Sequence, residues 1–157
     1  MEMRGRVYAK YIICCLMSLM VFGGMMGAFA DSYNPSEALD KLKSSNVRFS
    51  SGQSTHSNIS AERRKQVTTG GQHPFATIIA CSDSRVPVEI LFDQGVGDIF
   101  VIKVAGNVCN TDEIGSIEYG VDHLSTPVMV VLGHTHCGAC TAVATGADVH
   151  GCIPDLI

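Results

Sequence analysis

Phe-Ala-Thr-Ile-Ile-Ala-Cys-Ser-Asp-Ser-Arg at residues 75–85 is the stretch that decides the fold class. Its apolar part, Phe75–Ala80, has no alternation of apolar and charged residues and so predicts a strand buried on both faces. Two further nearly apolar runs, Ile99–Ala105 and Val128–Leu132, predict strands of the same kind. Apolar residues at helical spacing over Asp112–Leu124 separate these two runs. Strand, helix and strand in this order imply parallel crossovers, so we expect an α/β domain with a parallel-core sheet flanked by helices.

Three more helices are expected around these strands. One covers Ser36–Phe49 with its first residue as the N-cap, one covers Ala61–Val67, and one covers Gly138–Ala144. The chain then stops in an apolar segment that ends at Ile157. Because only three strands are clear and this end is apolar, we interpret residues 31–157 as one domain that is incomplete at its C-terminus, a truncated gene product or a fragment.

The first 30 residues have the pattern of a secretory signal peptide. Three basic residues lie within the first ten positions, an uncharged apolar stretch covers residues 11–28, and Ala28-Phe29-Ala30 forms a small-x-small cleavage site before Asp31. We therefore expect an exported protein, periplasmic or secreted. The alternative is an uncleaved membrane anchor, because about 18 apolar residues can just span a bilayer.

The charge and the cysteine count narrow the possible partners. Loss of residues 1–30 removes one acidic and three basic side chains, so the formal charge changes from −4 to −6. No basic stripe remains, and we expect neither nucleic-acid binding nor, after cleavage, membrane association. Five of the seven cysteines stay with the domain, at positions 81, 109, 137, 140 and 152. An odd number cannot all form internal disulfides, which favours a bound metal over a disulfide scaffold.

Three soft metal donors follow two of the predicted strands. Cys81 comes directly after the first strand, and His134 and Cys137 come after the third. Because the carboxyl ends of parallel strands meet at the same edge of a sheet, we expect these side chains to reach one ion. A Cys₂His set leaves one tetrahedral position open, which is typical of catalytic rather than structural zinc.

Asp83 and Arg85 lie two and four residues beyond Cys81 and can form a charge-assisted pair. Such a pair is equally consistent with an ordinary ion pair that steadies a turn. Beside an open metal position, Asp83 could instead take the fourth position itself or accept the proton of a metal-bound water. Arg85 would then control which of these occurs.

Cys137 and Cys140 form a Cys-x-x-Cys pair, a spacing known from thiol–disulfide enzymes. We interpret Cys140 instead as a small buried side chain on the helix that follows. Oxidation of Cys137 with Cys140 is a hazard for the metal-free protein in an oxidising compartment. His136 lies in the same loop and is expected to face solvent.

Cys-Ser-Asp-Ser-Arg at residues 81–85 and Gly-His-x-x-Cys-Gly-Ala at residues 133–139 resemble the paired motifs of the β-class carbonic anhydrases. The resemblance continues in four further segments: Phe-Asp-Gln-Gly at 92–95, Gly-Asp-Ile-Phe-Val at 97–101, Ala-Gly-Asn at 105–107 and Gly-Ser-Ile-Glu-Tyr at 115–119. The resemblance runs from about Phe75 to the C-terminus.

This resemblance implies a zinc lyase that reversibly hydrates carbon dioxide to bicarbonate. Cys81, His134 and Cys137 would hold Zn²⁺, and Asp83 would either ligate the zinc in a closed state or pair with Arg85 in an open state. The open state would admit water as the fourth ligand, and the resulting zinc-bound hydroxide would attack carbon dioxide.

The resemblance also implies a homodimer or a higher homo-oligomer, with Gln94 as a candidate hydrogen-bond donor to the substrate. Two other functions stay open at this point. One is hydrolysis of a carbon dioxide analogue, carbon disulfide or carbonyl sulfide, at the same site. The other is an inactive zinc-binding remnant, because we expect a domain without its C-terminal part to bind zinc poorly or to aggregate.

Overall fold

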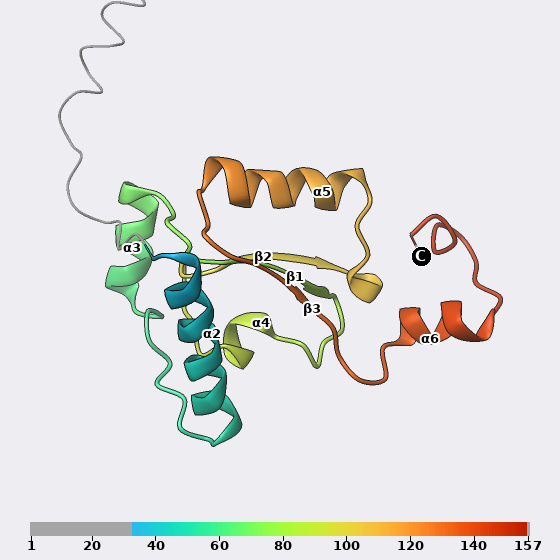
Figure 1. Cartoon of the computed structure of the whole chain (residues 1–157), viewed down its shortest axis with the longest axis horizontal. Coiled ribbons are helices and arrows are strands. Elements are labelled where there is room, and N and C mark those ends of the chain that lie inside the picture. Colours follow the sequence, from blue (N-terminus) through green and yellow to red (C-terminus); the bar gives the residue numbers. More distant parts are fainter. Residues whose placement is uncertain (1–32, 157) are drawn as a thin grey trace, which may run out of the picture. The chain divides into compact units, whose positions relative to one another are not determined.

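The computed structural model in Figure 1 describes residues 33–156. The expected signal peptide, residues 1–30, lies outside this part of the chain. With the labels of Figure 1, the helices are α2 (Pro35–Ser50), α3 (Ala61–Gly70), α4 (Val88–Leu91), α5 (Thr111–Glu118) and α6 (Gly138–Thr145), and the strands are β1 (Thr77–Cys81), β2 (Phe100–Val104) and β3 (Met129–Leu132). A 3₁₀ turn, η1 (Ala105–Asn107), follows β2, and a π-helical turn, η2 (Tyr119–His123), follows α5. In the part of the chain that the structure describes, no helix combines the length and the apolar character needed to cross a membrane.

The three strands form one parallel sheet in the order β2-β1-β3. The central strand pairs on both sides, so that Ile79 lies opposite Ile102 of β2 and opposite Val131 of β3. A parallel α/β sheet with flanking helices was predicted from the three apolar runs, and this prediction is confirmed.

Helices cover the two faces of the sheet, as Figure 1 shows. Ile78 and Ala80 of β1 belong to a cluster with residues of α2 and α4, and Ile79 belongs to a second cluster with Ile117 of α5. This division follows from the strand backbone, because successive side chains point to opposite faces. The central strand is therefore fixed from both sides, and its carboxyl end, which carries Cys81, has a defined position.

Only the central strand is buried along its whole length, so the prediction of three strands buried on both faces is wrong for the outer two. On β3, the side chain of Val131 is 63% exposed. On β2, Lys103 is exposed and its Nζ donates to the carbonyl oxygen of Val86 at 2.8 Å. Both strands lie at edges of the sheet, and α6, which follows β3, packs mainly against η1.

Two predicted helices differ from the structure in their ends. The N-cap of α2 is Asn34 rather than Ser36, because Asn34 and Glu37 form a capping box in which each side chain accepts from the other's backbone N–H, at 3.0 and 2.9 Å. The helix expected over Asp112–Leu124 is α-helical only to Glu118 and continues as a π turn. Gly120 lies in that turn and packs against β1 so closely that a Cβ atom would clash with Thr77 Oγ1.

Candidate metal centre

The site forms where β1 and β3 end side by side. Ala80 lies opposite Leu132 in the parallel register, so Cys81 and the loop 133–137 leave the sheet at the same edge. Cys137 is the last residue of this loop and the N-cap of α6, with an extended backbone. The predicted convergence of Cys81, His134 and Cys137 therefore follows from the pairing of two strands that lie about 50 residues apart in sequence.

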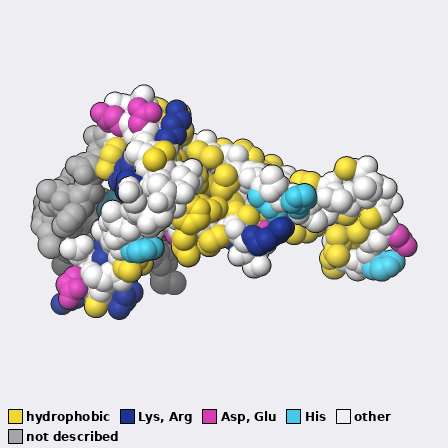
Figure 2. Space-filling view, turned by 90° about the horizontal axis from the view of Figure 1, so that it is seen from below, with side chains coloured by type: hydrophobic (Ala, Val, Ile, Leu, Met, Phe, Trp, Pro, Cys, Tyr) yellow, Lys and Arg dark blue, Asp and Glu magenta, His cyan; other side chains and the backbone are white. Residues whose placement is uncertain are grey.

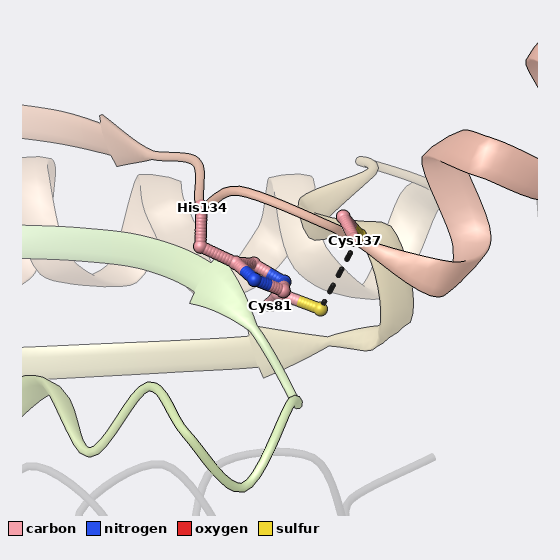
Figure 3. Close-up of side chains that lie close together, drawn as sticks. All are labelled: Cys81, His134 and Cys137. Carbon is pink, nitrogen blue, oxygen red and sulfur yellow. Dashed lines mark hydrogen bonds between the residues drawn. The ribbon is translucent and has the colours of Figure 1, made fainter.

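Cys81, His134 and Cys137 form one compact group of donors (Figure 3). Their ligand atoms all lie within 4.8 Å of one another, and the two Sγ atoms are 3.8 Å apart. Both cysteines are buried. The structure thus brings together the three side chains that the sequence proposed as metal ligands.

His134 is oriented for metal binding by its own loop. Its Nδ1 lies 3.0 Å from the carbonyl oxygen of Thr135, which can only accept, so Nδ1 carries the proton. The opposite nitrogen, Nε2, then has a free lone pair. Among residues 33–156 it is the one buried side-chain nitrogen or oxygen without a hydrogen-bond partner. An orphaned imidazole nitrogen beside two thiols fits a tetrahedral soft ion such as Zn²⁺.

The thiol of Cys81 lies in surroundings that favour its ionised form. Burial raises its pKa, but hydrogen bonds from the backbone N–H groups of Gly106 and Asp83, together with His134 and Cys137, outweigh burial and lower the pKa to about 7. The Gly106 nitrogen lies 3.2 Å from Cys81 Sγ. Because a metal binds the thiolate and not the thiol, this environment prepares Cys81 for metal binding near neutral pH.

Asp83 and Arg85 form a two-point ion pair beside the donor group. Arg85 Nε and Nη2 donate to the two carboxylate oxygens of Asp83 at 2.9 and 2.7 Å, and the backbone N–H of Arg85 donates to Oδ1 at 2.9 Å. Hydrogen bonds and charge from Arg85 hold the pKa of Asp83 well below its usual range, and those from Asp83 raise the pKa of Arg85.

This pair lies next to the metal donors without belonging to their group. Asp83 Oδ2 is 3.9 Å from His134 Nε2, and Arg85 Nη2 also donates to the carbonyl oxygen of His136 at 3.2 Å. The Arg85 side chain is 60% exposed and that of Asp83 is 19% exposed. Asp83 is thus engaged by Arg85 at the mouth of the site.

A cavity of about 360 Å³ opens beside the donor group, between η1, the loop 133–137 and α6. It is lined by Asn107, Gly133, His134, His136, Cys137, Cys140, Thr141 and Ala144. His136 is exposed, as predicted. Cys140 was predicted to be buried, and this is wrong: it is exposed, because α6 buries none of its residues against the sheet.

The family model for carbonic anhydrases matches residues 76–157, just over half of the chain. Solved β-carbonic anhydrases share the fold. The β-carbonic anhydrase CcaA is 32% identical with a TM-score of 0.51, and the match covers 68% of this chain and 53% of that one. CafA of Aspergillus fumigatus is 32% identical with a TM-score of 0.53, over 77% and 56% of the two chains. The chain belongs to the β-carbonic anhydrase family.

Curated carbonic anhydrases match a longer part of this chain than the family model does. The carbonic anhydrase of Mycolicibacterium smegmatis is 48% identical over 115 residues, 73% of this chain and 55% of that protein. Carbonic anhydrase 2 of Mycobacterium tuberculosis is 46% identical over 121 residues, 77% and 58% of the two chains. The chain thus spans a little over half the length of these two relatives.

Three features of this site were not predicted. The N–H of Gly106 donates to Cys81, the carbonyl of Thr135 orients His134, and Cys140 lines the cavity. Of these features, only the Gly106 hydrogen bond had a signal in the sequence. The Ala-Gly-Asn motif places a glycine at position 106, where the backbone has a φ of +80°. Gln94, expected to donate to a substrate, donates instead to Ser45 Oγ and to the carbonyl oxygen of Phe92, both at 2.8 Å.

Proposed function

We propose that this protein binds Zn²⁺ through Cys81, His134 and Cys137 and reversibly hydrates carbon dioxide to bicarbonate. The observation that carries the proposal is the donor group itself, two buried thiols and an orphaned imidazole nitrogen whose ligand atoms lie within 4.8 Å of one another. A three-residue set leaves a position for water, as catalytic zinc requires. Zinc held there would lower the pKa of that water and so supply the nucleophile that carbon dioxide needs.

Residues around the donor group keep its side chains in the form that binds a metal and place Asp83 beside them. Gly106 and Cys137 stabilise the Cys81 thiolate, and the Thr135 carbonyl keeps the proton of His134 on the nitrogen that faces away from the donor group. Arg85 engages both oxygens of Asp83, so the carboxylate accepts from the guanidinium and stays available 3.9 Å from His134 Nε2. In this role Asp83 would accept a proton from water, or would replace that water as a ligand when Arg85 releases it.

Stopped-flow measurement of carbon dioxide hydration by the full chain tests the proposal. We expect activity that zinc content limits, that a chelator removes and that added Zn²⁺ restores. Cys81→Ser should abolish zinc binding, whereas Cys152→Ser, which replaces an exposed cysteine outside the donor group, should not change it. A folded, zinc-loaded protein without hydration activity would overturn the proposal. Turnover of carbon disulfide or carbonyl sulfide by that protein would identify the analogue hydrolase, and no turnover of any of these would identify a remnant.

The role of the ion pair has its own test. Asp83→Asn keeps the size of the side chain but removes the charge, and we expect hydration to fall by about 10²-fold or more because proton transfer is lost. Asp40→Asn is the matched control, since Asp40 is 72% exposed and has only a 3.9 Å contact with Lys43. Equal activity of the two variants would show that the pair merely steadies the turn.

We further propose that the protein is exported and that residues 1–30 are its signal peptide. The support is the basic start, the apolar stretch of residues 11–28 and the small-x-small site before Asp31. Cell fractionation followed by intact-mass measurement should recover a chain that begins at Asp31 outside the cytoplasm. Recovery of the full-length chain in the membrane fraction would support the anchor instead.

Assembly into a homodimer or larger homo-oligomer completes the proposal. The chain exposes large apolar side chains that water does not favour, among them Ile90 (53%), Ile114 (47%) and Tyr119 (47%). Figure 2 shows hydrophobic side chains gathered over the middle of one face. One solved neighbour, from Sordaria macrospora, is described as tetrameric and is 26% identical with a TM-score of 0.55. Light scattering after size exclusion should give a mass of at least twice the monomer, and a monomer would contradict the proposal.

A further inference from the structure

We propose that Cys137 and Cys140 form a redox-active dithiol, with Cys140 as the thiol that attacks a low-molecular-weight disulfide such as oxidised glutathione. Oxidation would join the two cysteines and withdraw Cys137 from the metal donors. The inference goes beyond carbon dioxide hydration, because it concerns a thiol that the proposed reaction does not use.

The two thiols are placed to react with each other. Cys137 is the N-cap of α6, and Cys140 lies three residues on, in the first turn of that helix. The side chain of an N-cap residue lies near the third residue of its helix, both cysteines line the same cavity, and the interaction with Cys137 raises the pKa of the Cys140 thiol. Because Cys137 has an extended backbone and not a helical one, its side chain can turn toward Cys140 without unwinding α6.

Accessibility decides which thiol reacts first. Cys81 and Cys137 are buried, whereas Cys140 is exposed and lines the cavity of about 360 Å³. Cys137 lines the same cavity but is only 6% exposed, so an incoming tripeptide disulfide meets Cys140 first. Cys81 Sγ lies 3.8 Å from Cys137 Sγ and is the competing partner, but it is shielded from the incoming disulfide.

The reaction balances as two thiol–disulfide exchanges. The Cys140 thiolate attacks one sulfur of oxidised glutathione, forms a mixed disulfide and releases one glutathione thiolate, which takes up the proton that Cys140 lost. The Cys137 thiolate then attacks Cys140 Sγ, forms the Cys137–Cys140 disulfide and releases the second glutathione. The two cysteines lose two electrons and two protons, and one glutathione disulfide becomes two thiols.

This disulfide removes one side chain from the donor group. With Cys137 in a disulfide, only Cys81 and His134 remain of the three donors, and a disulfide sulfur is a poor ligand compared with a thiolate. Oxidation should therefore release a bound zinc ion, and reduction should restore the donor set. The protein would lose its metal reversibly under disulfide stress.

The experiment treats the reduced full chain, with and without Zn²⁺, with oxidised glutathione and then maps disulfides by peptide mass spectrometry. We expect a Cys137–Cys140 linkage with a mass loss of two hydrogens, release of zinc from the loaded sample in step with thiol loss, and reversal of both by dithiothreitol. The linkage in the metal-free sample tests the dithiol even if the protein proves not to hydrate carbon dioxide.

Two variants separate this dithiol from general thiol oxidation. Cys140→Ser should form no linkage to position 137 and should keep its zinc at oxidant concentrations that empty the parent. Cys152→Ser should behave like the parent. A Cys81–Cys137 linkage, lasting glutathione adducts without an internal disulfide, or equal zinc loss from Cys140→Ser and the parent would each overturn the proposal.

Discussion

Gly106→Ala should lower both the stability of the protein and its affinity for zinc. Gly106 has φ +80°, where an alanine costs about 1–2 kcal/mol, and its added Cβ would lie 2.9 Å from the Cβ of Ala139. Overpacking of this kind costs about 1–3 kcal/mol, so the expected loss of unfolding free energy is about 2–5 kcal/mol. The N–H of Gly106 also donates to Cys81 Sγ at 3.2 Å. A shift of this backbone therefore weakens the hydrogen bond that stabilises the Cys81 thiolate.

Urea unfolding of four proteins measures these two contributions separately: the parent, Gly106→Ala, Ala139→Gly and the double variant. Ala139→Gly removes the contact but not the backbone strain, so the double variant should recover about 1–3 kcal/mol relative to the sum of the single changes. With a typical m-value near 2 kcal/mol/M, a loss of 2 kcal/mol moves the midpoint by about 1 M. Zinc affinity, measured by competition with a chromophoric chelator, should fall in Gly106→Ala.

Two results would refute this reasoning. If Gly106→Ala unfolds at the same urea concentration as the parent, the positive φ carries no strain of the expected size. If the double variant shows no recovery, α6 moves freely away from η1 and the 2.9 Å contact is not restrictive.

Three further predictions concern charge and packing. Arg85 holds the pKa of Asp83 below its usual range, so the stability that this pair contributes is complete above pH about 4 and is lost only as the pH falls through the lowered pKa. In the Arg85→Gln variant, NMR titration should show the pKa of Asp83 back at about 3.9. The pKa of Cys81 is lowered from 9.0 to about 7, so the metal-free protein should gain stability as the pH rises between these values, and urea unfolding of Cys81→Ala should lack that gain. In the same assay Ile79→Ala, in the middle of the buried strand β1, should cost about 2–5 kcal/mol, whereas Val131→Thr on the exposed edge strand should change stability by only about 0.5 kcal/mol.

The sequence predicted the convergence of the donors because that convergence depends only on strand order and direction. Three apolar runs predict parallel strands, and parallel strands bring Cys81 and His134 to one edge regardless of how the side chains pack. The exposure of Cys140 and of Val131 was not predictable in this way, since it depends on where α6 goes after Cys137. Nor could spacing reveal Gly106, because its contribution comes from a backbone N–H that any residue carries.

The capping of α2 was missed for a different reason. Ser36 and Asn34 are both good N-cap residues, and the choice between them depends on Pro35, which has no N–H to donate and so fits the first position inside a helix. Glu37 at the third helical position completes the capping box with Asn34. Pro35 therefore favours Asn34 over Ser36 as the N-cap.

The separation of 56 residues between Cys81 and Cys137 has a consequence for biosynthesis. A nascent chain that has exposed Cys81 holds only one of the three donors, and the other two lie beyond β3, so the three come together only when β3 pairs with β1. Metal binding therefore follows the long-range pairing of β3 with β1. The entropy cost of closing the intervening chain arises before metal binding can offset it. Zinc supplied during refolding should raise the yield of folded chain without accelerating the pairing of the strands.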